Sequence, residues 1–391
     1  MILKIQSPPR HNCLYKKESI GYCILKVTPL KALILAGGFA TRLRPLSCSR
    51  PKTLFPIVNK PLLQWIFERL SENNINEAIL AVNALTEFYI KQHKIPKYNL
   101  KIKFSIDPPK MPLGTAGPIK RAEKIIGHEE PFLVLNGDIF ADLSYKELVE
   151  CHMKTGALAT LALCKVEDPC RYGVAELEEN NCIKRFIEKP AKGEVSTNLI
   201  NAGVYVLSPK VFDYIPKGKH VSMEREVFPI LAKEKKLYGH IVNGLWIDIG
   251  KPEEYLETNK LILEKLGTKK IRGQKCNFET KTPVALDKGV IVGEKSIIGP
   301  YAILGKNVTV GKGTRISNSV IFPDTKIGDS SSINGAIIGE GAVIGNNVNV
   351  SSGCIIADQA KIKDNLSLNN ETCVCPAKEI SENIIKRNII C

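Results

Sequence analysis

The chain has 391 residues, 44% of them hydrophobic and 24% charged, which is typical of a globular protein long enough for two domains. No apolar run approaches the roughly 20 residues that a membrane span requires. The net charge of +15 is not gathered in one basic stripe interleaved with aromatic residues, so we expect neither nucleic acid nor a membrane as a partner.

Residues 1–30 carry scattered cations and Pro8-Pro9 but no compact apolar segment, which argues against a secretory signal. Two interpretations stay open: a disordered extension, or residues upstream of a working start near Val27. We expect the twelve cysteines to be free thiols in the cytoplasm. A redox or metal role for the close pair Cys373 and Cys375 is the alternative to small buried residues.

The stretch from Lys31 to Lys52 joins an apolar run to a loop rich in glycine and cations. The run Ala32 to Ala36 is typical of a buried parallel strand, and it ends at Gly37-Gly38, where the backbone can turn tightly. Four cations follow the glycines: Arg42, Arg44, Arg50 and Lys52. This pattern favours a phosphate-binding loop, and the alternative is a strand followed by a solvated basic turn.

Short apolar runs then alternate with amphipathic stretches, which predicts a Rossmann-like, doubly wound, mostly parallel α/β sheet. Leu62 to Leu70 has helical periodicity, and Glu77 to Asn83 is typical of the next strand. Because ligands sit at the carboxyl ends of parallel strands, Asn83 would face the same crevice as Gly37. A helix cap is an equally good interpretation of Asn83.

The apolar run Phe132 to Asp138 places a carboxylate, Asp138, at the end of another predicted strand. Asp248 follows an apolar run in the same way, within L-W-I-D-I-G. Carboxylates at such a place can hold Mg²⁺ among phosphates, although each Asp alone is also a common turn former. The matching contexts favour a metal pair.

Two runs, L-A-G-G-F-A-T-R-L-R-P and R-P-K-T-L-F-P, resemble the signature of the sugar-nucleotide pyrophosphorylases, which join a sugar 1-phosphate to a nucleoside triphosphate. The family's usual form is G-G-x-G-T-R-L, and here Ala40 stands in place of the last glycine. Alanine is disfavoured there if the loop requires a positive φ. The resemblance implies a nucleotidyltransferase domain of the glycosyltransferase-A type.

The resemblance also implies roles for individual residues. Arg42 and Lys52 would hold the triphosphate, Asp138 would be catalytic, and Asp138 with Asp248 would bind Mg²⁺. The run L-G-T-A-G-P looks most like the nucleobase loop of the mannose-1-phosphate guanylyltransferase branch. Nucleotide contacts are then expected from Leu35, Ala36, Gly37, Gly38, Asn83, Gly114, Thr115, Asn136 and Gly137.

Three later segments, R-Y-G-V-A-E, F-I-E-K-P and N-A-G-V-Y, resemble segments that recur in this order in pyrophosphorylases. Glu188 can accept hydrogen bonds from hexose hydroxyls, and Lys189 supplies a compact cation for the sugar phosphate. Gly173 and Asn201 would complete the hexose pocket. Taken singly, these residues are also a turn glycine, a surface ion pair and the amide at a strand end.

The C-terminal third shows a six-residue repeat of apolar side chains, many followed by glycine. Its members are Val292, Ile298, Leu304, Val310, Ile316, Phe322, Ile327, Ile333, Ile338, Ile344, Val350, Ile356 and Ile362, with five-residue steps before Ile327 and Ile338. Such a repeat predicts a parallel β-helix. It resembles the left-handed β-helix appended to many pyrophosphorylases, and we expect it to form homo-oligomers. Acyl transfer, known for other proteins of this repeat, is disfavoured because no histidine follows His240.

These patterns predict a catalytic domain at 31–266, a linker at 267–286 and the β-helix at 287–391. The favoured reaction makes GDP-mannose from GTP and mannose 1-phosphate. The alternatives are a glucose-1-phosphate enzyme that uses UTP or dTTP, and a non-catalytic regulatory subunit, either pyrophosphorylase-like or like a translation-initiation exchange factor.

Overall fold

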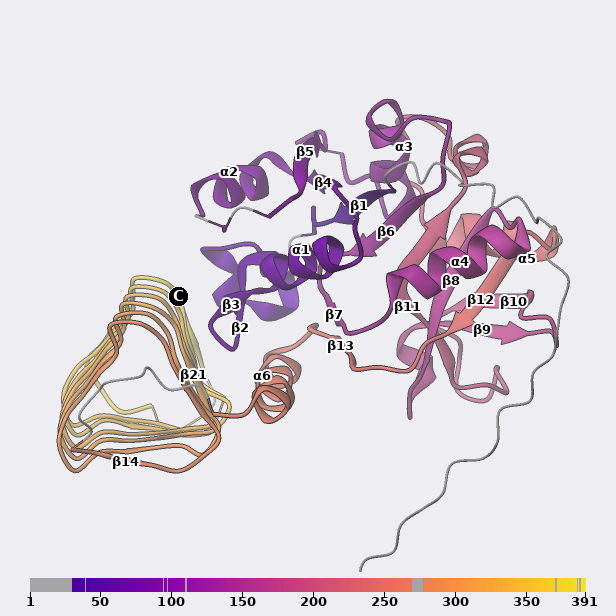
Figure 1. Cartoon of the computed structure of the whole chain (residues 1–391). Helices are drawn as coiled ribbons and strands as arrows, with labels where there is room; N and C mark the ends of the chain where they lie inside the picture. Colours follow the sequence, from indigo (N-terminus) through magenta and orange to yellow (C-terminus); the bar gives the residue numbers. More distant parts are fainter. Residues whose placement is uncertain are drawn as a thin grey trace, which may run out of the picture.

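The computed structural model describes residues 30–38, 40–93, 95–96, 98–109, 111–268, 277–369, 371–384, 386 and 388–391. The predicted N-terminal extension, apart from Leu30, lies outside the described residues. An α/β domain and a three-sided β-helix stand side by side, and helix α6 (Pro252–Leu266) leads from the first to the second (Figure 1). No helix within the described part of the chain is long and apolar enough to cross a membrane.

The α/β domain is organised around one mixed sheet of nine strands. Along its main path the strand order is β10-β9-β11-β6-β1-β4-β5, with β8 beside β11 and β12 beside β8. The strands are β1 (Lys31–Leu35), β4 (Glu77–Val82), β5 (Lys101–Ile106), β6 (Phe132–Asn136), β8 (Ala159–Lys165), β9 (Gly173–Leu177), β10 (Ile183–Glu188), β11 (Leu199–Leu207) and β12 (Leu237–Ile241).

The sheet has a parallel half and an antiparallel half. Strands β6, β1, β4 and β5 run parallel, as the alternation of apolar runs and helices predicts. Strand β11 runs antiparallel to β6, β8 and β9, and β9 is antiparallel to β10. The two halves meet at the pair β6 and β11, so the carboxyl end of β6 lies beside the amino-terminal part of β11.

Helices cover both faces of the sheet. The helices are α1 (Leu62–Glu72), α2 (Ala84–Gln92), α3 (Ala116–Ile126), α4 (Tyr145–Thr155), α5 (Phe228–Lys233) and α6, with short 3-10 helices η1 (Thr41–Leu43), η2 (Leu46–Cys48), η3 (Lys52–Leu54), η4 (Pro169–Arg171) and η5 (Pro209–Tyr214) and a π-helix η6 (Met223–Val227). Strand β1 shows why both faces are covered: Ala32 and Ile34 belong to one hydrophobic cluster, and Leu33 belongs to the other.

Two small ladders complete this domain. Strand β7 (Ile139–Ala141) pairs antiparallel with β13 (Trp246–Asp248), and Asp248 stands opposite Ile139. This ladder brings a segment more than a hundred residues downstream against the end of β6. Strands β2 (Pro56–Ile57) and β3 (Lys60–Pro61) form a hairpin before α1.

The β-helix has three parallel sheets whose partner residues are 17 or 18 positions apart, and 16 in the last pair, consistent with a left-handed β-helix of three hexads a coil. One sheet holds β14 (Glu279–Thr280), β17 (Ile297–Ile298), β20 (Arg315–Ser317), β23 (Ser332–Asn334), β26 (Asn349–Val350) and β29 (Ser367–Leu368). A second holds β16 (Ile291–Val292), β19 (Thr309–Val310), β22 (Lys326–Ile327), β25 (Val343–Ile344), β28 (Lys361–Ile362) and β31 (Glu379–Ile380). The third holds β15 (Val284–Leu286), β18 (Ala302–Leu304), β21 (Ser319–Ile321), β24 (Ile337–Ile338), β27 (Ile355–Ile356), β30 (Cys373–Val374) and β32 (Ile389–Ile390).

The repeat predicted from the sequence needs a correction at Phe322. Ile321, one position earlier, packs in the β-helix interior. Phe322 packs instead with the α/β domain, where its ring lies near Phe55 and Tyr255 with centroid separations of 6.3 Å. An aromatic ring is buried equally well on the outside when a second domain covers it, so periodicity alone misplaces it by one residue.

Two further predictions are wrong. Strands β14 and β15 lie within the stretch that we predicted as a linker, so the β-helix begins by Glu279 rather than at residue 287. Part of that stretch, residues 269–276, lies outside the described residues. A disulfide joins Cys375 to Cys391, so these two residues are not the free thiols expected, and Cys375 is not paired with its sequence neighbour Cys373.

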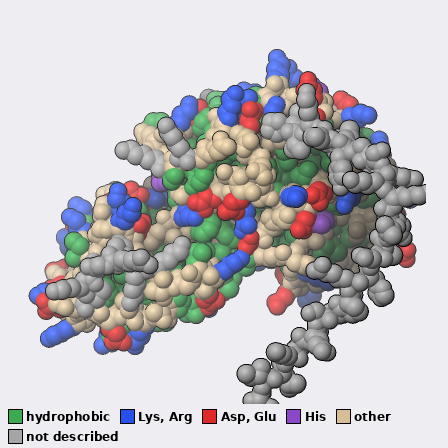
Figure 2. Space-filling view, in the orientation of Figure 1, with side chains coloured by type: hydrophobic (Ala, Val, Ile, Leu, Met, Phe, Trp, Pro, Cys, Tyr) green, Lys and Arg blue, Asp and Glu red, His purple; other side chains and the backbone are tan. Residues whose placement is uncertain are grey.

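The third sheet of the β-helix faces the α/β domain. Its outward side chains Ala285, Ile303, Val320, Ile337 and Ile355 belong to the same hydrophobic cluster as β1, α1 and α6. In the space-filling view the two domains form two joined lobes, with acidic and basic side chains along the line where they meet (Figure 2). The two domains therefore share one continuous core.

Candidate active site

Polar groups and glycines line the edge of the sheet where the parallel strands end. Going inward from the edge strand, Asp107 follows β5, Asn83 follows β4, Gly37 follows β1, and Asp138 follows β6. Because the four strands are parallel and adjacent, their carboxyl ends open onto one crevice.

A cleft of about 750 Å³ lies along this edge. The predicted residues that line it are Leu35, Ala36, Gly37, Gly38, Arg42, Lys52, Asn83, Gly114, Thr115, Asn136, Gly137 and Asp138. Other residues that line it include Ala40, Thr41, Asp107, His220 and Gly250. The volume is within the range of small-molecule binding sites.

Lys52 joins the two aspartates that the sequence pairs. Its ammonium nitrogen lies 2.9 Å from Asp138 Oδ2 and 3.8 Å from Asp248 Oδ1. The Lys52 side chain is only 8% exposed, whereas Asp138 is 48% exposed toward the cleft. The β7–β13 ladder is what brings Asp248 to this point, so the two carboxylates do converge.

The electrostatics of the pair reflect this closeness. Burial raises the pKa of the Asp248 carboxyl, the negative charge of Asp138 raises it further, and Lys52 and Arg42 act in the opposite direction. Two carboxylates that repel each other in a partly buried place need additional positive charge. Lys52 supplies part of it, and a bound cation would supply the rest.

The donor set fits Mg²⁺. That ion usually takes one or two protein carboxylates and leaves its other positions to phosphate and water. In the described part of the chain no group of three or more His, Cys, Asp and Glu side chains gathers around one point, as a closed all-protein metal site would require. Asp138 and Asp248 are therefore the residues suited to hold such an ion.

Close backbone contacts shape the middle of the cleft. Gly137 donates a hydrogen bond from its N–H to the Leu35 carbonyl at 2.9 Å, and a Cβ at position 137 would lie 2.9 Å from the same oxygen. Only glycine allows β6 and β1 to end this close together. Gly38, by contrast, has no neighbour among the described residues within 4 Å of where its Cβ would stand, so these residues leave its backbone open to a ligand.

Ala40 adopts the left-handed conformation, with φ 45° and ψ 44°, although this conformation is disfavoured for alanine and the family usually has glycine at this position. Ser47 stabilises it by donating from its hydroxyl to the Ala40 carbonyl at 2.8 Å. The strain of a non-glycine residue in this region is of the order of 1 kcal/mol. The loop therefore keeps the glycine-type conformation without the glycine.

Asn83 serves both purposes that the sequence left open. Its side-chain oxygen accepts from Thr86 N–H at 2.8 Å and so caps α2, and its side-chain nitrogen donates to the Gly37 carbonyl at 3.0 Å. The cap thereby ties the glycine turn to the neighbouring strand.

The loop before α3 is also closely packed. Gly114 in this loop has φ 70°, and a Cβ there would collide with the Val221 carbonyl, so the loop is packed tightly on the segment before η6.

Asp107 is a candidate that no motif revealed. One of its carboxylate oxygens, Oδ1, is buried and has no hydrogen-bond partner among the described residues. Burial raises the pKa of Asp107 to about 6, although Arg121 acts in the opposite direction. Its other oxygen lies 3.0 Å from where a Cβ of Gly37 would stand. An acceptor left unpaired at a cleft wall is suited to a donor from a ligand.

The predicted sugar-side residues lie together in the antiparallel half of the sheet, outside the lining of the 750 Å³ cleft. Glu188 stands opposite Gly173 in the β10–β9 ladder, where a side chain at 173 would meet the Phe186 ring and the Glu188 carboxylate. Asn201 Oδ1 accepts from Gly203 N–H at 3.0 Å within an irregular stretch of β11. Lys189 has φ 53° and lies 3.7 Å from Glu188.

Glu224 of η6 contacts Thr115, in the loop predicted to bind the nucleobase, and its charge acts on Glu188. Sequence reasoning missed this residue. Its Oε2 accepts from Thr115 Oγ1 at 2.6 Å and from Ser222 Oγ at 2.8 Å. Burial raises the pKa of Glu188, and the charge of Glu224 raises it further. The sequence holds no motif that marks Glu224; the signal is structural, because π-helical turns such as η6 are frequent at functional sites.

The phosphate-loop interpretation needs one correction. Of its four cations, Arg42 and Lys52 line the cleft, but Arg44 is not among the described residues that do so. Arg50 turns away from the cleft and forms ion pairs with Glu340 and Asp358 of the β-helix. Short 3-10 turns on either side of Arg50 reverse its direction relative to Lys52, and sequence proximity cannot show this.

Comparison with known families gives two matches that divide the chain as the fold does. The family described as nucleotidyl transferase matches residues 31–265, and the domain described as the GMPPB C-terminal domain matches residues 280–390.

Curated relatives support the same assignment. The mannose-1-phosphate guanylyltransferase catalytic subunit beta of Drosophila melanogaster is 42% identical over 240 residues, covering 61% of this chain and 64% of that protein. The mannose-1-phosphate guanyltransferase of Saccharomyces cerevisiae is 40% identical over 242 residues, covering 61% of this chain and 66% of that protein. The match thus spans slightly less than two thirds of each relative.

Solved structures resemble the α/β domain. HddC from Yersinia pseudotuberculosis, in complex with GMP-PN, is 30% identical with a TM-score of 0.50, covering 60% of this chain and 99% of that one. A UDP-glucose pyrophosphorylase in complex with UDP-glucose is 24% identical with a TM-score of 0.53, covering 61% of this chain and all of that one. At that identity the second likeness concerns the fold alone.

Proposed function

This chain belongs to the nucleotidyl transferase family, and we propose from that premise that it joins a nucleoside triphosphate to a sugar 1-phosphate and releases pyrophosphate. We favour GTP and mannose 1-phosphate as the substrates and GDP-mannose as the product. The curated relatives quoted above are mannose-1-phosphate guanylyltransferases, which supports this choice.

One observation carries the proposal: Lys52, Asp138 and Asp248 converge from three separate segments, and Lys52 and Asp138 of this group line the cleft. A protein that only binds a nucleotide does not need a buried lysine between two carboxylates. Nucleotidyl transfer does, because negative charge builds up on the phosphates as the reaction proceeds.

In the proposed reaction an oxygen of the sugar 1-phosphate attacks the α-phosphorus of the triphosphate in line. A new P–O bond forms, the bond from the α-phosphorus to the β-phosphate oxygen breaks, and its electron pair leaves with pyrophosphate. Arg42 and Lys52 stabilise the charge on the triphosphate and on the departing pyrophosphate. Positioning of this kind supplies most of the rate in phosphoryl-type transfer.

We assign Asp138 and Asp248 to Mg²⁺, which when bound would neutralise phosphate charge and orient the α-phosphate. The other requirement, placing the nucleophile, falls to Lys189 and Glu188. Lys189 supplies a cation for the sugar phosphate, and Glu188 accepts hydrogen bonds from sugar hydroxyls.

The base preference rests on Asp107. Guanine presents two neighbouring N–H donors, N1–H and the N2 amino group, which a carboxylate can accept together. Uracil and thymine present one N–H between two carbonyl oxygens, and those oxygens would repel the same carboxylate. A buried, unpartnered Asp107 oxygen in the cleft wall therefore favours a guanine base.

Two further proposals concern assembly and location. We propose that the β-helix mediates a homo-oligomer, because its first and second sheets do not carry the cluster shared with the α/β domain. The cytoplasmic location expected from the sequence stays a prediction.

Ala40 favours a second candidate, a sensor that binds a sugar nucleotide without making it. The cost of holding alanine in the left-handed region would favour other conformations of the glycine turn and so weaken triphosphate binding, while leaving the sugar-side group intact. In that case sugar nucleotides would bind but no pyrophosphate would be released.

One experiment separates these functions. The full chain is incubated with Mg²⁺, each of GTP, UTP, dTTP and ATP, and mannose 1-phosphate or glucose 1-phosphate, and pyrophosphate is measured. We expect release that requires both substrates and is fastest with GTP and mannose 1-phosphate. If no pair yields pyrophosphate while calorimetry detects binding of GDP-mannose, the sensor is correct and the enzyme is not.

A further inference from the structure

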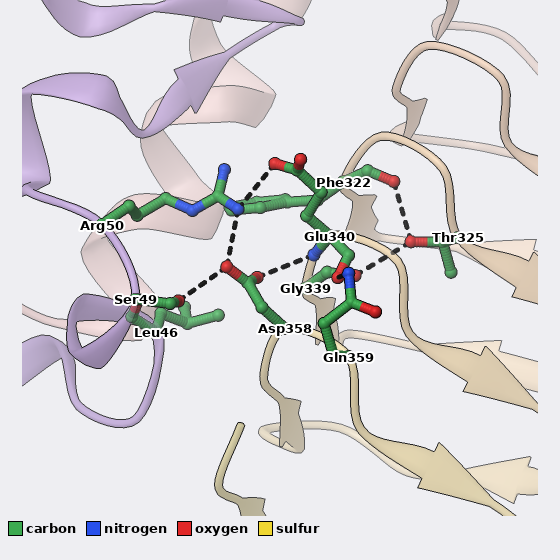
Figure 3. A network of polar contacts seen from close by, with 9 residues as sticks. All are labelled: Leu46, Ser49, Arg50, Phe322, Thr325, Gly339, Glu340, Asp358 and Gln359. Carbon is green, nitrogen blue, oxygen red and sulfur yellow. Dashed lines mark hydrogen bonds and ion pairs between the residues drawn. The ribbon is translucent and has the colours of Figure 1, made fainter. Parts of the chain in front are cut away.

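The loop between β1 and β2 has two faces, and the second one touches the β-helix. One face presents Arg42 and Lys52 to the cleft. The other face presents Ser49 and Arg50, which reach toward Glu340 and Asp358 across the domain boundary (Figure 3). The same short segment therefore carries groups for the proposed chemistry and groups for contact between domains.

The contact is made of several short, directed interactions. Arg50 Nη2 donates to Asp358 Oδ2 at 2.6 Å and to Glu340 Oε2 at 2.7 Å. Ser49 Oγ donates to the same Asp358 oxygen at 2.6 Å. The Arg50 guanidinium also lies 4.9 Å from the centroid of the Phe322 ring, at a distance that favours a cation–π contact.

The β-helix side of the contact is rigid. Asp358 Oδ1 accepts from the backbone N–H of Glu340 at 2.7 Å, so the carboxylate is fixed between two successive coils (Figure 3). The next residue back, Gly339, donates its N–H to the Ile356 carbonyl at 2.6 Å in the coil-to-coil ladder. Asp358 therefore offers a fixed anchor rather than a mobile surface charge.

Arg50 depends on this anchor. Its side chain is 14% exposed and that of Asp358 is 11% exposed. Its Nε is buried with no hydrogen-bond partner among the described residues. A guanidinium removed from water in this way is held mainly by its carboxylate partners, and removing Arg50 would leave the mostly buried Asp358 carboxylate without its counter-charge.

The path from Arg50 to the cleft is short. Lys52, two residues later, begins η3, and the Leu54 N–H donates to the Pro51 carbonyl at 2.9 Å. Phe55 at the end of this turn packs edge-on to Tyr255 with centroids 5.7 Å apart. Between Ala40 and Phe55 the loop has only 3-10 turns, so its shape is set largely by what it contacts.

We propose that Arg50 is a positioning residue: Asp358 and Glu340 of the β-helix hold the far face of the loop so that Lys52 stays directed between Asp138 and Asp248. The β-helix then contributes to the reaction from outside the cleft. This inference rests on the proposed function for its kinetic consequence, but not for its structural one.

The kinetic test uses the full chain with Arg50→Met, Arg50→Lys and Asp358→Asn. The matched control is Lys103→Met, which removes a cation that pairs with Glu77 at 2.7 Å within the α/β domain, away from the cleft. We expect Arg50→Met to lower kcat about 10- to 100-fold, as small misplacements of positioning groups do, with the KM for the sugar 1-phosphate unchanged. Arg50→Lys should recover part of the loss, and the control should keep the activity of the unsubstituted protein.

The structural test measures amide hydrogen exchange in residues 41–55 of the same proteins, each checked for folding by its melting temperature. We expect about tenfold faster exchange in this segment for Arg50→Met and for Asp358→Asn, and unchanged exchange for Lys103→Met. Asp358→Asn keeps one acceptor oxygen of the two and leaves Arg50 its ion pair with Glu340, so it provides a milder variant if Arg50→Met does not fold.

The two measurements separate the two hypotheses. If the unsubstituted protein releases no pyrophosphate with any substrate pair, the proposed function fails, and the exchange data still decide whether Arg50 orders the loop. If the unsubstituted protein is active and Arg50→Met matches Lys103→Met in kcat, the inference is overturned. Unchanged exchange in residues 41–55 of both anchor variants would overturn it as well.

Discussion

The parallel and antiparallel halves of the sheet prepare their parts of the site differently. In the parallel half, neighbouring strands end together, and Gly37, Gly38 and Gly137 bring backbone to the lining of the cleft. In the antiparallel half, an irregular stretch of β11 and a left-handed Lys189 place single side chains. Regular strand geometry thus forms a general groove, where we propose that phosphates bind, whereas local irregularity places the groups that would recognise a particular sugar.

This contrast can be tested first where the halves meet. Asp138→Asn removes one of the two carboxylates that converge on Lys52. We expect pyrophosphate release to fall on the order of 10³-fold, because charge stabilisation at the reacting phosphates is lost. The measurement is initial velocity with GTP and mannose 1-phosphate over a range of Mg²⁺ concentrations.

The control for this variant is Asp213→Asn, which changes an exposed aspartate of η5 distant from the cleft lining. Turnover by Asp138→Asn equal to that of the control would remove Asp138 from the proposed mechanism.

A smaller effect is expected at the outer end of the parallel half. Asp107→Asn replaces a carboxylate that can accept two donors by an amide that offers a donor and an acceptor. We expect kcat/KM for GTP to fall about 10- to 100-fold, the range for hydrogen bonds to charged groups, while kcat/KM for UTP stays the same or rises. Rates for both nucleotides are compared in one preparation, so UTP is the internal control. Equal losses for GTP and UTP would show that Asp107 does not read the base.

A substitution in the antiparallel half should affect the sugar phosphate rather than the nucleotide. Glu188→Gln is expected to raise the KM for mannose 1-phosphate about tenfold and to leave the KM for GTP unchanged. Glu179→Gln, at an exposed position before β10, is the matched control. If the KM for GTP rises as much as the KM for mannose 1-phosphate, the two halves of the sheet do not recognise the two substrates separately.

The smallest expected effect concerns pH. Burial raises the pKa of Asp107 to about 6, and only the ionised carboxylate can accept both guanine donors. GTP binding should therefore weaken as the pH falls through 6, by about fourfold between pH 7.5 and pH 5.5. Calorimetric titration with GTP at several pH values measures this, and Asp107→Asn should remove that part of the dependence.

The same carboxyl has the reverse effect on stability without ligand. The pKa of Asp107 is about 6 in the folded protein, above the ordinary value of 3.8. Between pH 3.8 and pH 6 the folded protein therefore binds more protons at this carboxyl than the unfolded chain does. The free energy of unfolding contributed by Asp107 therefore falls as the pH rises through this window. Ligand binding and stability should thus respond to acid in opposite directions at this residue.

The sequence predicted the architecture well where a pattern repeats or where an apolar run ends in glycine or aspartate. The helix from Leu62, the strands ending near Asn83 and Asp138, and the interior of the β-helix follow from periodicity. The prediction for Phe322 was wrong because burial against a second domain is indistinguishable, in sequence, from burial in the β-helix axis.

The candidate site was predictable only in part. The glycine turn and the paired aspartates came from local patterns and from resemblance. Asp107 could not be found in this way, because an aspartate before two prolines is an ordinary turn signal and its importance comes from burial. Arg50 was assigned to the wrong partner, because its neighbours in sequence face the cleft while its own contacts are almost three hundred residues away.

The shared hydrophobic cluster has a consequence for any shortened form of the protein. A chain that ends after α6 would leave Phe55 and Tyr255 without the Phe322 ring that covers them. The residues of the α/β domain that pack against Val320 and Ile337 would be uncovered as well. Such a fragment would expose a large apolar surface to water and tend to self-associate. The isolated α/β domain should therefore be poorly soluble, although every residue of its cleft is present.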